Sequence, residues 1–278
     1  MDSVFAAAEA AATAVRAEFS VAGPPVDLYA LARQMNVDQI VVRSMIGDGR
    51  LEQHPGCRII AVQAHAGAAR RRFTIAHELG HVWLQKQTEY SFGHDSDERF
   101  CNAFAAALLL PRDWIAAQAR SHEPSLVGLQ RIAENADVSL ASCLLRLRRF
   151  RPWRFTLVSW RWDEGDWRML SVTGLPADIR ASTGVATVDR TRRALDIIAQ
   201  LSQQPVGGSL WLGVGDRVQS FPAEIAVRKL TAVAIVDLSG HVPPRSKKAV
   251  GPRRTEGADR GGQPPRGTRR THHAGAGV

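Results

Sequence analysis

Residues 74–83 constrain this chain most, because they contain the pattern His-Glu-x-x-His. His77 and His81 lie four positions apart, so in a helix their imidazoles leave the same face one turn apart and can bind one metal ion together. Glu78 lies one step round the helix, beside the remaining coordination positions, where a general base can reach metal-bound water. The pattern therefore predicts a helical metal site built on these three residues.

The rest of this stretch supports a helix that is buried on one side. Ile75, Leu79 and Val82 recur at helical spacing and give the helix an apolar face. Thr74 is suited to be its N-cap. The alternative is a surface helix that holds two histidines and a glutamate by chance, because a pattern with three fixed positions also arises without function.

A third protein ligand has to come from elsewhere, since hydrolytic zinc sites usually have three protein ligands and a water. The extended pattern that supplies a third histidine is absent, because Leu84 and Gln87 occupy the positions that need Gly and His. Residues 97–111, which contain several carboxylates and alanines, offer a ligand in its place.

Residues 97–111 predict a second helix that ends at Pro111. The stripe that we expect to be buried consists of Phe100, Phe104 and Leu108. Glu98, Asn102 and Ala105 form a neighbouring face, on which the small alanine lets this helix lie close to the first. We therefore expect Glu98 beside the metal.

Together the two stretches resemble the ImmA/IrrE family of metallo-endopeptidases. The matching positions, all within residues 25–150, are residues 70–81, Glu98, Asn102, Phe104, Ala105 and residues 108–111. The resemblance assigns the metal to His77, His81 and Glu98. It assigns the general base to Glu78. The chain departs from the family at Cys101, where alanine is usual, and this small apolar exchange changes little.

The resemblance implies a zinc-dependent endopeptidase with a zincin-like fold. Zn²⁺ would lower the pKa of its bound water toward about 7, and Glu78 would take the proton of that water. The same ligand set also suits Mn²⁺ and other divalent ions. Because the family acts on helix-turn-helix repressors, the resemblance further implies limited cleavage of an XRE-type repressor in a stress or mobile-element response.

Two other features are candidates for substrate contact. Residues 40–43 and 57–63 are rich in β-branched side chains and predict strands, with a turn at residues 48–49 between them. We nominate residues 57–63 as an edge strand on which an extended peptide pairs. In the polar loop after the metal helix, Tyr90 or His94 is a candidate for stabilising the oxyanion, although a solvated loop residue is the simpler interpretation.

The chain predicts an α+β fold in three parts. Residues 1–151 would form the metallopeptidase domain. Residues 152–240 predict a small α+β domain on an antiparallel sheet, because two strand-like runs are joined by a hairpin signal at residues 163–166 and further strand-like runs follow a helix at residues 191–201. Some ImmA/IrrE-like proteins have a GAF-like sensor domain after the protease, so this domain is a candidate for one. It carries no ligand-binding motif.

Most of the net charge of +9 lies at the end of the chain. From Arg245 onward there are nine Lys and Arg residues against Glu256 and Asp259. Residues 241–278 contain repeated Pro, Gly and Arg and few large apolar side chains, so they predict a disordered basic tail. Such a tail attracts polyanions weakly, and incidental solvated disorder is an equal interpretation.

The remaining composition indicates a cytoplasmic protein. The three cysteines are far apart, odd in number and set in apolar surroundings, which fits a reduced compartment. No stretch approaches 18 unbroken apolar residues, so no membrane span is expected. Residues 1–20 predict a helix, not a signal peptide, because charged residues interrupt them.

A rival function is DNA binding through residues 124–151. Two amphipathic helices with a turn at residues 137–139, followed by several arginines, resemble a helix-turn-helix. In this reading the chain is a transcriptional regulator with a structural or vestigial metal site. The turn has no Gly, and the arginines lie at the end of the second helix, away from the usual reading face. We therefore expect no direct sequence-specific DNA binding, and an intact Glu78 favours the enzyme.

Overall fold

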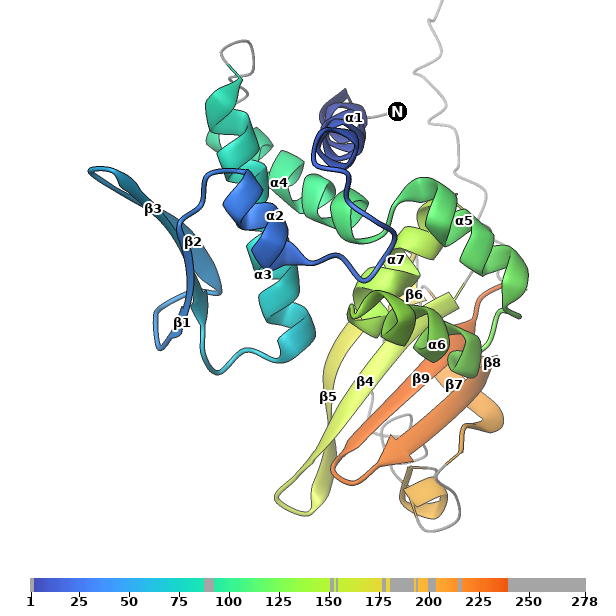
Figure 1. The fold of residues 1–278 in the computed structure, drawn as a ribbon. Coiled ribbons are helices and arrows are strands. Elements are labelled where there is room, and N and C mark those ends of the chain that lie inside the picture. Colours follow the sequence, from blue (N-terminus) through green and yellow to red (C-terminus); the bar gives the residue numbers. More distant parts are fainter. Residues whose placement is uncertain are drawn as a thin grey trace, which may run out of the picture. The chain divides into compact units, whose positions relative to one another are not determined.

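The structure is a computed structural model, and Figure 1 shows the course of its chain. It describes residues 3–87, 93–150, 153, 155–176, 179–180, 193, 195–199, 204–214 and 217–239. By its contacts the chain divides into residues 1–242 and residues 243–278. All described residues belong to the first unit, and the predicted basic tail lies outside them.

The fold is α+β, as the sequence predicts. The helices are α1 (Ser3–Glu18), α2 (Leu28–Gln34), α3 (Ala68–Lys86), α4 (His94–Leu109), α5 (Arg112–Ser121), α6 (Leu126–Ala136) and α7 (Leu140–Phe150). The strands are β1 (Gln39–Arg43), β2 (Gly49–His54), β3 (Cys57–Gln63), β4 (Phe155–Asp163), β5 (Asp166–Thr173), β6 (Ile179–Arg180), β7 (Val206–Val214), β8 (Arg217–Arg228) and β9 (Thr231–Asp237). Residues 193 and 195–199 are also helical. In the described part of the chain, every helix is too short or too polar to span a bilayer.

The first sheet has three strands in the order β1, β3, β2 (Figure 1). β1 runs parallel to β3, and β2 runs antiparallel to it. The strand Cys57–Gln63 therefore lies in the centre of the sheet, and its nomination as an edge strand is wrong. β2 was not predicted because Arg50, Glu52 and Gln53 interrupt its apolar pattern, which suits a strand whose outer edge is exposed.

The helix that carries the histidines begins earlier than the sequence suggested. α3 starts at Ala68 with Gly67 as its N-cap, so Thr74 is not the cap and that prediction is wrong. Residues 68–73 extend the helix because alanine and arginine are good helix formers. The Arg71 guanidinium donates to the carbonyls of Ala64 and Ala66, which fixes the chain before the first turn.

α4 packs closely on α3 through its predicted apolar stripe. Phe100, Phe104 and Leu108 are fully buried, as expected. The two helices lie close together at Gly80, where an added Cβ would lie 3.1 Å from the Cα and 3.2 Å from the Sγ of Cys101. A glycine at this point therefore lets the two helices meet with their polar faces side by side, which sets the distance between the candidate ligands.

The second sheet has the order β5, β4, β9, β8, β7, β6, and all its neighbouring strands are antiparallel. The predicted hairpin joins β4 to β5 through Glu164 and Gly165, both at positive φ. One face of the sheet has its own apolar cluster, which includes Val158, Trp160 and Phe221. The predicted antiparallel sheet is thus present. The predicted helix at residues 191–201 is described only in part.

The second sheet also joins the core of the helical region. Leu157, Ala226 and Ile235 belong to the same buried cluster as the α3 and α4 side chains. The carboxylate of Glu224 on β8 accepts from the backbone N–H of Leu126 at 2.8 Å, which caps the first turn of α6. The domain boundary at residue 151 stays a prediction.

Candidate metal centre

α3 and α4 bring the three predicted ligands together. The Nε2 atoms of His77 and His81 lie 3.2 Å apart on one face of α3. The Glu98 carboxylate on α4 lies 3.4 Å from Nε2 of His77 and 3.3 Å from Nε2 of His81. One ligand atom from each residue lies within 4.8 Å of the other two. Two imidazoles and one carboxylate thus converge on a single point.

Their spacing fits a zinc ion. Ligands that surround zinc tetrahedrally at about 2.0–2.1 Å lie about 3.4 Å from one another. The two Nε2 atoms are 3.2 Å apart, and each lies 3.3–3.4 Å from one of the two Glu98 oxygens, His77 from Oε2 and His81 from Oε1. Three protein ligands leave the fourth tetrahedral position for water or substrate. The side chains of His77, His81 and Glu98 are 14, 25 and 42% exposed, so a substrate can reach the site.

Asn102, one turn after Glu98 on α4, orients the first histidine. Its Oδ1 lies 3.1 Å from Nδ1 of His77, so Nδ1 donates and Nε2 keeps its lone pair for a metal. Burial, and then the neighbouring His81, lower the pKa of His77, which favours the neutral imidazole that binds metal. Asn102 therefore belongs to the site, although it would not touch the metal itself.

Glu78 lies against β2, beside Gly49 and Leu51. Its side chain is buried, and burial together with the nearby charge of Glu98 raises its pKa to about 7. The backbone N–H of Leu51 on β2 bonds to the carboxylate and favours its charged form. A carboxylate whose pKa lies near neutral pH can both accept and return a proton, as a general base must.

β2 follows the length of α3 past Glu78. At its start the Asp48 carboxylate pairs with Arg70, and toward its end Gln53 hydrogen-bonds to Gln85 at 2.5 Å. β2 and α3 therefore run in the same direction. An added Cβ on Gly49 would lie 2.3 Å from Cγ2 of Thr74 and 2.9 Å from the carbonyl of Ala61, so only glycine lets the strand lie this close to the helix.

Other predicted site residues are not part of this cluster. Tyr90 lies outside the described residues. His94 begins α4 and is exposed, so its suggested oxyanion role remains a prediction. Two of the arginines considered for DNA contact have internal partners. Arg146 is buried and bonds to Glu9 and to the carbonyl of Leu110, and Arg148 donates to the carbonyl of Phe155.

Three functional positions were missed by sequence reasoning. Asn102 was placed on the correct helix face without a role, although an amide one turn from a ligand is a usable signal for a histidine-orienting residue. Gly49 was interpreted only as part of a turn. Leu51 acts through its backbone N–H, which leaves no trace in the side-chain pattern.

Comparison with known proteins also points to metallopeptidases. Residues 35–148 match the M78 peptidase family, described as the IrrE N-terminal-like domain. The radiation response metalloprotease IrrE of Deinococcus radiodurans is 33% identical over 108 residues, which cover 35% of this chain and 33% of that protein. IrrE of Deinococcus deserti is 30% identical over 153 residues, 51% of this chain and 54% of that protein.

The chain thus spans only about a third and about half the length of these curated relatives. Among solved structures, a Mycobacterium tuberculosis transcriptional regulator is similar with a TM-score of 0.47 and 17% identity, over 85% of this chain and 88% of that one. This likeness is too weak to support a conclusion. The matched segment contains the whole His77, Glu78, His81 and Glu98 cluster, so the part of the chain that is similar to the IrrE metalloproteases is the part that carries the candidate metal centre.

Proposed function

We propose that this protein is a zinc-dependent endopeptidase that makes limited cleavages in a protein substrate. The observation that carries the proposal is the convergence of His77, His81 and Glu98 at 3.2–3.4 Å on the face of α3 that also presents Glu78. A structural metal site has no use for a buried carboxylate beside its ligands. A hydrolytic site needs one to move a proton.

In this proposal, His77, His81 and Glu98 hold the metal, and Glu78 transfers protons. A bound Zn²⁺ would supply Lewis-acid chemistry, polarising the scissile carbonyl and activating water. Glu78 takes the proton of the attacking water and returns it to the leaving amine. Asn102 holds the His77 ring so that Nε2 faces the cluster.

The proposed substrate is an extended segment that pairs with the free edge of β2. β2 is paired to β3 on one side, and among the described strands nothing pairs with its other side. An added strand would therefore find N–H and C=O groups along this edge, apart from the Leu51 N–H, which bonds to Glu78. Only a flexible linker or a locally unfolded segment can present its backbone in this way, which limits cleavage to few sites.

From the resemblance to the ImmA/IrrE family, we propose an XRE-type repressor as the substrate, in a stress or mobile-element response. A cytoplasmic location is supported by Cys57, Cys101 and Cys143, which are all free thiols. The bound arginines of α7 do not favour the rival DNA-binding function.

The test is incubation of the zinc-loaded protein with an XRE-type repressor encoded beside it, with products mapped by intact mass. We expect one or two cuts in a linker, lost on chelation and restored by zinc. Glu78→Gln is the matched control, because it preserves the shape of the side chain and removes its proton affinity. Equal cutting by this variant would refute the proposal.

A further inference from the structure

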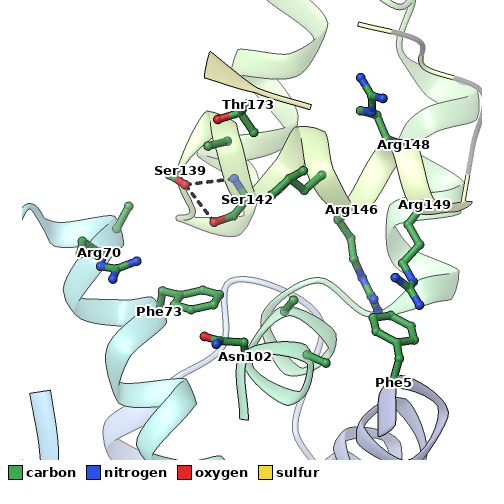
Figure 2. Close-up of a pocket in the computed structure, with 15 residues that line it drawn as sticks. Phe5, Arg70, Phe73, Asn102, Ser139, Ser142, Arg146, Arg148, Arg149 and Thr173 are labelled. Carbon is green, nitrogen blue, oxygen red and sulfur yellow. Dashed lines mark hydrogen bonds between the residues drawn. The ribbon is translucent and has the colours of Figure 1, made fainter. Parts of the chain in front are cut away.

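A pocket of about 810 Å³ opens beside the metal centre (Figure 2). Its walls come from α3, α4 and α7, with Phe5 of α1 and Thr173 of β5 at its margin. Figure 2 shows Phe73 and Asn102 on one side, facing Ser139 and Ser142 at the start of α7. This volume lies in the range of sites that enclose a drug-sized ligand. Such a site can also hold several side chains of a peptide.

The pocket continues the line of the candidate metal ligands. On α3, Phe73 lies one turn before His77, which lies one turn before His81. On α4, Ala106 lies one turn after Asn102, which bonds to His77. One turn is about 5.4 Å, and a residue of an extended chain spans about 3.3 Å. A peptide lying over the cluster therefore reaches the pocket within about two or three residues.

The direction of β2 shows which part of a substrate reaches the pocket. β2 begins beside Arg70, which lines the pocket, and ends near Gln85 at the far end of α3. A peptide that pairs antiparallel to β2, the slightly more stable arrangement, runs from Gln85 toward Arg70. Its residues after the scissile bond then lie at the pocket.

The lining combines apolar surface with positive charge. Among the described residues that form it are Arg70, Arg146, Arg148 and Arg149, and no acidic side chain. The apolar part consists of Phe5, Phe73, Ala103, Ala106 and Leu145, with further alanines. Such a wall favours a ligand that has an apolar body and carries a carboxylate.

Two of the arginines are placed to recognise that carboxylate. Arg146 and Arg148 are held by a buried ion pair and by a backbone carbonyl, so their charges already serve the fold. Arg70 and Arg149 are the more exposed pair and lie on opposite sides of the pocket, with the Arg149 guanidinium over the ring of Phe5 (Figure 2). Arg70 pairs with Asp48 on the surface, where ion pairs contribute about 0–1 kcal/mol and exchange partners readily.

We propose that this pocket is the specificity site for the substrate residues that follow the scissile bond, and that it selects an apolar residue with an acidic neighbour. The assignment of the pocket to substrate residues rests on the proposed endopeptidase function. Its binding chemistry can be measured in a protein that does not cleave.

The experiment uses zinc-loaded Glu78→Gln protein and fluorescein-labelled, acetylated alanine octapeptides with Leu-Asp at successive positions. The same series with Leu-Lys is the comparison. We expect the Leu-Asp peptides to bind about tenfold more tightly than the Leu-Lys peptides, the effect of about 1.4 kcal/mol in binding free energy. Arg70→Glu or Arg149→Glu should abolish or reverse this preference.

Arg161→Glu is the matched control, because Arg161 is an exposed arginine of β4 that does not line the pocket. It should leave the preference unchanged, and melting curves of each variant show that it is folded. Arg70→Gln and Arg149→Gln give the same test if a reversed charge prevents folding. No binding of either series, equal binding of both, or a preference that survives in the pocket variants would overturn the proposal.

A second arm locates the residues along the substrate. Peptides that bind are offered to the wild-type enzyme, and the cut is mapped by mass. An acidic residue two or three positions after the cut supports the assignment, and one before the cut contradicts it. If the bound peptides remain uncut while the wild-type enzyme cuts the repressor, the assignment of the pocket to residues after the scissile bond fails. If neither is cut, the proposed endopeptidase function fails, and the charge preference shows only that the pocket binds acidic peptides.

Discussion

The two regions of this molecule treat buried charge differently. Among the described residues, the buried charged side chains are Glu78 and Arg146, and both lie in the helical region. In the described part of the second sheet, the one buried polar side chain is that of Thr156, which is neutral and donates to the carbonyl of Gly174. The sheet thus follows the ordinary rule that a protein core excludes charged side chains. The helical region buries two charged side chains, and burial of a charge is unfavourable unless it is paired.

The two buried charges also differ from each other. Arg146 is matched by Glu9, at 2.9 Å, and by the Leu110 carbonyl, so its charge is compensated and structural. Glu78 lies near another carboxylate, Glu98, and both burial and that charge work against its ionised form. A buried carboxylate beside a second one indicates function, since it does not stabilise the fold.

Replacement of Glu78 should separate activity from stability most clearly. Glu78→Gln should lower the rate of cleavage by about 10²–10⁴-fold, the usual contribution of a general base. It should leave the melting temperature of the metal-free protein unchanged or higher, because it removes a buried charge. Cleavage rates and calorimetric melting curves check both parts. A clear loss of stability would mean that the carboxylate is structural.

Replacement of the partner of Arg146 should have the opposite outcome. Glu9→Ala leaves a buried guanidinium without its carboxylate, which typically costs about 3–5 kcal/mol of stability. Denaturant unfolding measures this loss. The control is Glu164→Ala, whose carboxylate is 79% exposed in its ion pair with Arg168 and should change stability by no more than about 1 kcal/mol. Similar effects of the two changes would remove the distinction between these ion pairs.

A smaller effect should appear where the sheet meets the helices. Glu224→Ala removes the side chain that accepts from Leu126 N–H at the start of α6. Loss of such a cap costs about 1 kcal/mol. The unfolding transition should remain single, because Leu157 and Ile235 share a core with the helices. Two separate transitions, in this variant or in the wild type, would show that the sheet and helices are independent domains.

The sequence predicted what depends on side-chain periodicity. The stripe of Phe100, Phe104 and Leu108 and the face that carries Glu98 follow from spacing along one helix, and the structure places them as expected. The start of α3 was misplaced at Thr74, because the apolar periodicity that marked the helix begins only at Ile75, although the alanines and arginines before it are good helix formers. β2 was missed because its polar side chains break the apolar alternation that predicts a strand, and its contact with Glu78 is made by the backbone.

The distances between site residues on different helices and strands were harder to predict from the sequence than the helices themselves. The contact of Leu51 N–H with Glu78 and the passage of Gly49 over Thr74 join residues from different elements. No local pattern encodes such distances. By contrast, His77 and His81 belong to one helix, so their relative position was fixed once that helix was predicted.

The central claim is that His77, His81 and Glu98 together hold one metal ion, and the metal content of purified protein tests it most directly. The wild type should bind about one zinc per chain. Glu98→Ala should weaken zinc binding by at least about tenfold in a competition titration with a chelator. Loss of a residue that only supports a ligand already lowers metal affinity by about 10–100-fold, and loss of the ligand itself should lower it at least as much. The matched control is Asp97→Ala, which removes the neighbouring carboxylate on α4 and should leave zinc binding unchanged. Full zinc affinity in Glu98→Ala, or equal loss in both variants, would contradict the account.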